Sequence, residues 1–226
     1  GGREISFKKL LIIKNKYKLK IIKDSSKGIY PAMNIATQIA KGNHLLFLNA
    51  GDKISSSNVF NNILNLNLKK NYNYFFLCKV VGTYKKWIIP SHNKLINTDK
   101  RRVPVHQGIL FCKKFYKKNQ YDENMYIASD YAVKNIMLKE LNFKFIPYLI
   151  SEHYLGGISS NYKLKNYITT AIELFKIDLK YRRITALFVN QLLLFTKFVI
   201  HNLLSGLLLE KILSKYHSLK SYEIKT

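Results

Sequence analysis

An acidic side chain follows an apolar segment early in the chain, where it is suited to bind a metal ion. Residues 44–48 (HLLFL) are nearly continuous in apolar character, and the polar segment 49–52 (NAGD) follows them. Magnesium is typically held by one or two carboxylates together with phosphate oxygens. Asp52 is therefore placed to hold a divalent cation between two phosphates. The alternative is an Asx-type turn, in which Asn49 and Asp52 satisfy only backbone groups.

A second carboxylate and a histidine form two further polar clusters. Asp130 lies in the segment 128–131 (ASDY), at the start of a predicted helix. An aspartate in the first turn is usually a cap or a partner of the helix dipole. It can also be a general base that takes a proton from an acceptor hydroxyl. His106 and Gln107 lie at the entry to a predicted strand, where a single histidine is more often structural than catalytic.

Lys27 and Gly28 precede another predicted helix. A lysine there brings a cation close to the helix N-terminus, and glycine leaves the backbone bare, which together favour a bound phosphate. The alternative is an ordinary turn in which Gly28 adopts a left-handed conformation.

The elements that must position these residues alternate between helix and strand. A helix is predicted at 3–15, a short strand at 18–23, and a helix at 31–40 that begins at Pro31. The apolar run 44–48 is typical of a buried parallel strand. This alternation indicates an α/β sheet, and open α/β sheets bind ligands beyond the carboxyl ends of their strands.

Downstream of Asp52 the pattern is less regular but still mixes both kinds of element. The chain is expected to form a helix at 55–69, strands at 72–81, 87–89, 108–112 and 143–150, a loop at 91–103, a helix at 129–140 with Ser129 as its cap, and helices from 159 onward.

Taken together, seven segments of the chain resemble the inverting family-2 glycosyltransferases of the GT-A fold. They follow the order of the family and are 27–34 (KGIYPAMN), 40–42 (AKG), 48–52 (LNAGD), 106–108 (HQG), 121–123 (YDE), 129–131 (SDY) and 156–159 (GGIS). The likeness is greatest to small bacterial transferases of colanic acid, capsule and O-antigen synthesis. These enzymes take part in the synthesis of surface polysaccharide and lipopolysaccharide. The resemblance implies a GT-A-like mixed sheet flanked by helices within residues 1–160.

The resemblance also implies a role for each candidate residue. Asp52 would bind Mg2+ or Mn2+ on the diphosphate of a UDP- or GDP-linked sugar, and Asn49 would line the same turn. Lys27, Gly28 and Asn34 would face the nucleotide of the donor.

For the acceptor side, the resemblance implies that Asp130 is the general base that activates the acceptor hydroxyl. His106 and Gln107 would lie near that acceptor. The expected reaction is transfer of a hexose, with inversion, to a saccharide or a polyprenyl-linked acceptor.

Several positions depart from the family pattern. Pro31 stands where an aspartate is common, Ser26 replaces a common acidic residue, and Gly51 stands where many members have a second aspartate. Gly1 and Gly2 align with a turn that normally follows the second strand. The resemblance therefore implies that the first strand-helix-strand unit, about 30 residues, is missing together with part of the nucleotide pocket. An inactive remnant that only binds a membrane or a partner is the alternative.

The C-terminal part, residues 161–226, is predicted to be a helical tail. Its segment 185–209 is mostly apolar, with Lys197 as its only charge. We interpret it as an amphipathic helix lying in a membrane interface, with flanking basic residues suited to anionic headgroups. A helix packed on the domain or a partner and a true membrane span are the alternatives. The expected location is the cytoplasmic face of a bacterial plasma membrane.

The chain is strongly basic, with 38 Lys and Arg against 13 Asp and Glu, and a formal net charge of +25. Such an excess is typical of proteins that bind nucleic acid, an anionic membrane or an acidic substrate. Only 5 of the bases are arginine, and no zinc-finger spacing or RNA-binding motif is present. The sequence therefore argues against a nucleic-acid partner. Abundant Asn, Ile and Tyr indicate that A/T-rich codons are an alternative source of the lysines.

Overall fold

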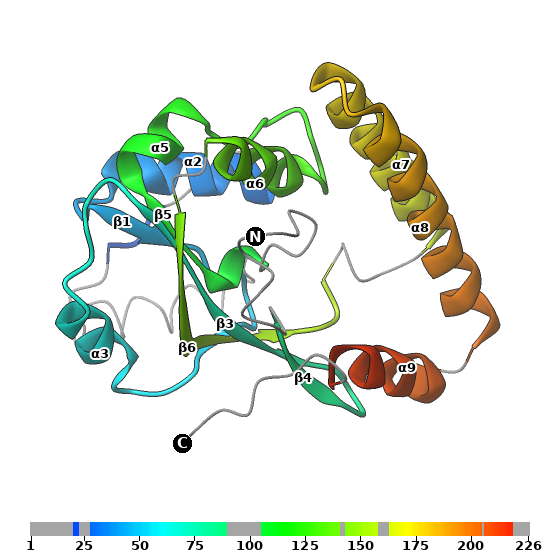
Figure 1. Cartoon of the computed structure of the whole chain (residues 1–226), viewed down its shortest axis with the longest axis horizontal. Coiled ribbons are helices and arrows are strands. Elements are labelled where there is room, and N and C mark those ends of the chain that lie inside the picture. The colour runs from blue at the N-terminus through cyan, green and yellow to red at the C-terminus, as the bar shows by residue number, and fades with distance from the viewer. Residues whose placement is uncertain are drawn as a thin grey trace.

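The computed structural model describes residues 20–22, 28–89, 105–140, 143–157, 163–204 and 206–218. A twisted sheet lies at the centre, with helices α2, α5 and α6 over one face (Figure 1). Helix α3 lies at the lower left, and the C-terminal helices α7 and α8 lie side by side to the right. Of the predicted elements, the helix at 3–15 and the loop at 91–103 fall outside the described residues.

The sheet has six strands and is mixed. They are β1 (His44–Leu46), β2 (Lys53–Ile54), β3 (Asn73–Val81), β4 (Lys86–Ile89), β5 (Ile109–Cys112) and β6 (Phe143–Tyr154). The order is β1-β5-β3-β6-β2, and β4 pairs with the C-terminal half of β3. Strands β3 and β6 are parallel, whereas the other pairs are antiparallel. The α/β class and the mixed, helix-flanked sheet predicted from the sequence are confirmed.

The apolar run after residue 43 was expected to be a parallel strand, and within the described residues this expectation is wrong. Strand β1 pairs antiparallel with β5, with Leu45 opposite Phe111. A continuous apolar run indicates that both faces of a strand are buried, but it does not indicate whether the strand is parallel or antiparallel to its neighbour. The strand expected at 18–23 is described only at 20–22, which have no regular secondary structure.

Strand β6 is longer than the predicted 143–150 and contains an irregularity. Pro147 cannot donate a backbone hydrogen bond to a neighbouring strand. The pairing with β3 is regular up to Phe145, then resumes at Leu149 with a shifted register. The strand then continues to Tyr154, so it carries His153 beyond the end of the predicted strand.

The helices that precede the C-terminal tail are α2 (Ile29–Ile39), α3 (Val59–Asn65), α5 (Lys113–Lys118) and α6 (Ser129–Lys139), with a 3-10 turn η1 (His106–Gly108) before β5. Helix α3 is shorter than the expected 55–69. Ser129 is not the cap of α6, because Ala128 occupies that position and the Ser129 hydroxyl instead accepts a hydrogen bond from Asp122 N at 2.6 Å.

Two hydrophobic clusters hold the helices on the sheet. The larger one joins α2, α5 and α6 to the sheet through aromatic side chains, among them Phe75, Phe111 and Tyr116. The smaller one packs Val59 of α3 against Phe76 and its neighbours on the opposite face. Successive residues of a strand point to opposite faces, so Phe75 and Phe76 serve different clusters.

The predicted helical tail consists of α7 (Leu164–Lys180), α8 (Ile184–Leu203) and α9 (Gly206–Ser218). Two buried glutamates join it to the rest of the chain. Glu173 of α7 accepts hydrogen bonds from the backbone N–H groups of residues 126–128 at 2.6–2.9 Å. Glu210 of α9 does the same for residues 83–85, in the turn between β3 and β4, at 2.6–2.9 Å.

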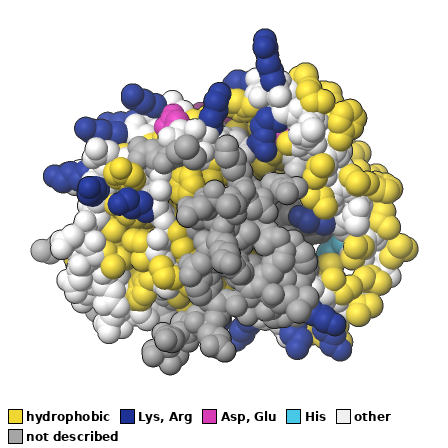
Figure 2. All heavy atoms as spheres, viewed as in Figure 1, with side chains coloured by type: hydrophobic (Ala, Val, Ile, Leu, Met, Phe, Trp, Pro, Cys, Tyr) yellow, Lys and Arg dark blue, Asp and Glu magenta, His cyan; other side chains and the backbone are white. Residues whose placement is uncertain are grey.

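The outer side of the tail is apolar. Figure 2 shows hydrophobic side chains gathered over α7 and α8. The exposed members on these two helices include Ile168, Ile172, Phe175, Leu179, Phe188, Leu192 and Phe195. Within the described part of the chain, only α8 is long and apolar enough to cross a membrane, and only 11% of its apolar stretch is buried.

Candidate functional site

The 3-10 turn η1 brings the two predicted catalytic regions together. His106 and Gln107 are consecutive residues of this turn, and both are buried. Gln107 donates its side-chain amide to Asp52 at 2.7 Å, whereas His106 Nδ1 lies 3.9 Å from Asp130 Oδ2. The structure therefore gathers Asp52, Gln107, His106 and Asp130 around one short turn.

Asp52 is the centre of a dense hydrogen-bond network. Its side chain is 2% exposed. One oxygen accepts from Gln107 Nε2 and from Asn49 N at 3.1 Å. The other lies 3.0 Å from His153 Nδ1 and accepts from Tyr154 N at 3.1 Å. Burial alone would raise the pKa of Asp52, but hydrogen bonds from Gln107, His153 and Tyr154 N–H outweigh it and lower the pKa.

The side chains of Asp52, Gln107 and His153 compete for the same hydrogen atoms. Gln107 Nε2 lies 3.0 Å from His153 Nδ1, which requires the imidazole nitrogen to accept. The same nitrogen lies 3.0 Å from an Asp52 oxygen, which requires it to donate. One ring nitrogen cannot do both. In addition, Gln107 Oε1 is buried and has no hydrogen-bond partner among the described residues.

This arrangement fits a divalent cation. Two neighbouring ligands of an octahedral ion at about 2.1 Å are roughly 3 Å apart, which matches the separation of Asp52 and His153. Rotation of the Gln107 amide would direct its unpartnered Oε1 to the same point and end the competition for hydrogens. In the described part of the chain, no group of three His, Cys, Asp or Glu residues forms a metal cluster. At this site two such side chains, Asp52 and His153, lie next to each other, with the Gln107 amide beside them.

Asp130 lies in the first turn of α6, in an ion pair. Lys134, one helical turn further on, places its Nζ 3.0 Å from Asp130 Oδ2. Burial raises the pKa of Asp130, but the positive charge of Lys134 and the nearby imidazole of His106 outweigh burial, so the pKa lies far below its ordinary value. The side chain is nevertheless 22% exposed, so solvent can reach it.

Helix α7 supports the start of α6, where Asp130 lies. The Glu173 carboxylate holds the backbone N–H groups of Tyr126, Ile127 and Ala128, the three residues before α6. Tyr131, next to Asp130, donates its hydroxyl to Asp178 of the same helix at 3.1 Å. The tail therefore takes part in the geometry of the site.

The predicted donor-binding residues do not all gather at this site. Asn34 is buried at 3% exposure, and its side chain bonds to Tyr121 O and to Glu123 Oε1 at 2.9 Å, while Tyr116 donates to it. Asn34 therefore organises the interior beneath α2 in this structure. Gly28 precedes α2 with a φ of 120°, which favours glycine. Lys27 lies outside the described residues.

Sequence reasoning missed three residues of the site. His153 lies on a strand and belongs to no motif, so only the pairing of β6 brings it to Asp52. Glu173 reaches the loop before α6 from 45 residues away. Lys134 had a detectable signal, because oppositely charged residues four apart on a helix are neighbours.

Comparison with known proteins identifies the fold. No protein-family model and no curated protein sequence matches the chain. The structure of S. aureus TarS residues 1–349 in complex with UDP superposes with a TM-score of 0.53 at 13% identity, over 77% of this chain and 54% of that one. A second TarS 1–349 structure gives 0.52 at 14% identity, over 76% and 52%. The chain thus spans about half the length of the TarS structures it matches.

The likeness concerns the architecture, since so few residues are identical. TarS is a staphylococcal glycosyltransferase. The central mixed sheet and its flanking helices, predicted here from the order of seven short segments, are shared with it. The chain therefore has a GT-A-like mixed α/β fold.

Proposed function

We propose that the chain is a glycosyltransferase that moves a sugar from a nucleotide-sugar donor to an acceptor hydroxyl with inversion. One observation carries this proposal: within a GT-A fold, consecutive residues of η1 contact two separate carboxylates, Asp52 and Asp130. The reaction needs charge stabilisation at the departing diphosphate and a base at the acceptor hydroxyl. Asp52 serves the first purpose and Asp130 the second.

Asp130 acts as the base in this proposal. Its low pKa keeps the carboxylate ionised at physiological pH. A carboxylate of low pKa is a weak base, so it takes the proton late, after bond formation to the anomeric carbon has made the hydroxyl acidic. Lys134 holds the Asp130 carboxylate in place, and His106 lies on its other side. Inversion follows from direct in-line attack.

On the donor side, we infer that Asp52 and His153 hold Mg2+ or Mn2+, with the Gln107 carbonyl as a third ligand. A divalent cation there supplies positive charge to the diphosphate that leaves. The Asn49–Asp52 turn presents its backbone to the same region, and Gly51 adopts a φ of 96° within it. Gly28 and Lys27 are proposed to face the donor from the start of α2.

We also propose that the tail attaches the enzyme to the inner face of a bacterial plasma membrane. The exposed apolar side chains of α7 and α8 share one side of the molecule, as seen in Figure 2. Contiguous apolar surface of this kind marks a protein or membrane contact. Basic residues at the ends of the two helices, Lys165, Lys180 and Arg182, suit anionic headgroups. This location favours a polyprenyl-linked acceptor in surface polysaccharide synthesis.

The proposal is tested by calorimetric titration with UDP and with GDP, each with and without Mn2+. We expect one nucleotide to bind in a Mn2+-dependent manner, and Asp52→Asn to remove the dependence. Asp130→Asn should bind that nucleotide as the wild type does but release no UDP or GDP from the nucleotide-sugar when acceptor is present. Glu140→Gln, which changes an exposed carboxylate just after α6, is the matched control. Nucleotide binding that depends neither on Mn2+ nor on Asp52 would contradict the proposal.

A further inference from the structure

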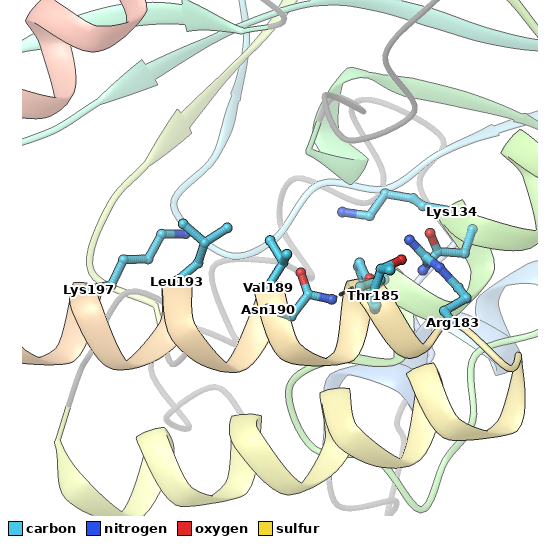
Figure 3. Close-up of a pocket in the computed structure, with 10 residues that line it drawn as sticks. Lys134, Arg183, Thr185, Val189, Asn190, Leu193 and Lys197 are labelled. Atoms are coloured by element: carbon cyan, nitrogen blue, oxygen red, sulfur yellow. Dashed lines mark hydrogen bonds between the residues drawn. The ribbon is translucent and has the colours of Figure 1, made fainter.

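A cavity of about 570 Å3 lies between the start of α8 and the α6 helix that carries Asp130. In Figure 3, Val189, Asn190, Leu193 and Lys197 project from one side of α8, and Lys134 extends from α6 over the same space. Arg183 enters from the α7–α8 connection. Volumes of this size are typical of sites for small molecules.

The charged side chains that line this cavity are all cations. They are Lys134, Arg183 and Lys197, and no carboxylate of the described residues lines it. Tyr131 and Asn190 add polar groups that are held in place by Asp178 of α7, at 3.1 and 2.6 Å. Clustered Lys and Arg with neighbouring polar groups are the side chains that recognise phosphate.

Arg183 lies over the ring of Tyr131, with its guanidinium carbon 5.5 Å from the ring centroid. Its nearest ion-pair distance to Asp178 is 3.8 Å, beyond a hydrogen bond. Its Nη1 atom is buried and has no hydrogen-bond partner among the described residues. Because Arg183 lines the cavity and makes no hydrogen bond to Asp178, its guanidinium can bind an oxyanion there. The planar guanidinium also matches the oxygens of a phosphate in two-point contact.

The cavity shares a residue with the proposed catalytic base. Lys134 lines the cavity and also pairs with Asp130 at 3.0 Å. An anion bound to Lys134 therefore lies close in space to the Asp130 carboxylate, which would activate the acceptor. The geometry favours a single ligand that presents its phosphate to the cavity and its hydroxyl to Asp130.

The opposite side of α8 faces outward. Phe188, Leu192 and Phe195 are exposed there, whereas Asn190 and Lys197 face the cavity. A helix with its side chains is about 10–12 Å across. If the outer side of α8 contacts a membrane, the cavity lies within about one helix diameter of the lipid surface. A phosphate attached to a lipid can reach it from there.

We propose that this cavity binds the phosphate or diphosphate of the acceptor and thereby holds the acceptor hydroxyl at Asp130. The inference rests on the proposed transferase function and narrows its acceptor to a phosphorylated class of molecule. It assigns Arg183 and Lys197 as specificity residues that bind the acceptor and take no part in proton transfer.

The test uses inorganic pyrophosphate as the probe, titrated into the full chain. Saturating UDP or GDP with Mn2+ is present throughout, so that the donor site is already occupied. Arg183→Gln and Lys197→Gln should each weaken pyrophosphate binding about tenfold, and Arg183→Lys should recover part of the loss. Lys176→Gln, an exposed lysine of α7 outside the cavity, should leave it unchanged. Circular dichroism of each variant establishes that it is folded.

Other outcomes separate this inference from the proposed function. The acceptor site alone is overturned if the chain binds nucleotide but not pyrophosphate. It is also overturned if pyrophosphate binding is unchanged in the Arg183 and Lys197 variants. Pyrophosphate binding that depends on Arg183, in a chain that binds no nucleotide, overturns the transferase proposal instead. Flotation with phosphatidylglycerol vesicles is the second arm. If both glutamine variants lose vesicle binding as strongly as they lose pyrophosphate, the cavity binds a lipid headgroup and the acceptor assignment fails.

Discussion

Gln107 and Asp52 are joined by a 2.7 Å hydrogen bond between side chains that lie 55 residues apart in the sequence. Because His106, the preceding residue, lies 3.9 Å from Asp130, one short turn connects the proposed donor and acceptor halves of the site. A displacement of η1 would therefore disturb both carboxylates together. The predictions below follow from this connection and from the two contacts by which the tail is attached.

A Gln107→Glu substitution should make the fold depend on a divalent cation. The new carboxylate would lie about 3 Å from Asp52, and two like charges at that distance repel. We expect a loss of about 2 kcal/mol in EDTA, or several degrees in Tm. Added Mn2+ should recover most of the lost stability, since a second anionic ligand strengthens the site. Thermal unfolding with and without Mn2+ measures both effects.

The matched control for this experiment is Gln38→Glu, an exposed glutamine on α2. Its Tm should be indifferent to Mn2+. If Gln107→Glu behaves like this control in both conditions, Asp52 and His153 do not form a metal site.

The stability contributed by Asp130 should depend on pH. Its pKa is held far below the ordinary value in the folded chain. Its ionised form therefore stabilises the fold above the unfolded pKa of about 3.9, and this contribution is lost as the pH falls toward the folded pKa. Denaturant unfolding of the wild type and of Asp130→Asn should differ by about 1–2 kcal/mol at pH 6. The gap should shrink at pH 3; an equal gap at both pH values would contradict the ion-pair explanation.

Glu173→Gln should impair catalysis from outside the reacting centre. The substitution removes the charge that binds three backbone N–H groups ahead of α6. Hydrogen bonds to a charged group contribute about 1.5–3 kcal/mol, so we expect a loss of stability in that range. The turnover rate should fall while Mn2+-dependent nucleotide binding stays unchanged, because α6 carries Asp130 and not Asp52. Glu140→Gln, an exposed glutamate just after α6, is the control.

Gly82→Ala should detach α9. A Cβ atom at this position would lie 2.5 Å from Glu210 Oε2, and the carboxylate binds the N–H groups of Thr83, Tyr84 and Lys85. We expect a destabilisation of about 1–3 kcal/mol, as for other overpacked sites. Limited proteolysis should then cleave near α9 more quickly. Gly157→Ala, where an added Cβ meets nothing within 4 Å, should behave as the wild type does.

Local sequence was sufficient to predict the class of fold and several of its elements. The apolar and aromatic runs indicated strands near β3, β5 and β6, and Gly28 marked the start of α2. These signals depend on neighbours within a few residues, which is why they could be read without a structure. The candidate positions Asp52, His106, Gln107 and Asp130 also came from short segments and their order.

Tertiary structure decided which of these residues meet. Strand direction at β1, the shifted register of β6 past Pro147, and the arrival of His153 at Asp52 all depend on pairing between distant segments. The same holds for Glu173, whose carboxylate reaches the start of α6 from the tail. Sequence periodicity determines whether a side chain is buried, but only the packing of the sheet and helices determines its partner. The sequence alone thus defined the carboxylates, and the fold placed them on either side of one turn.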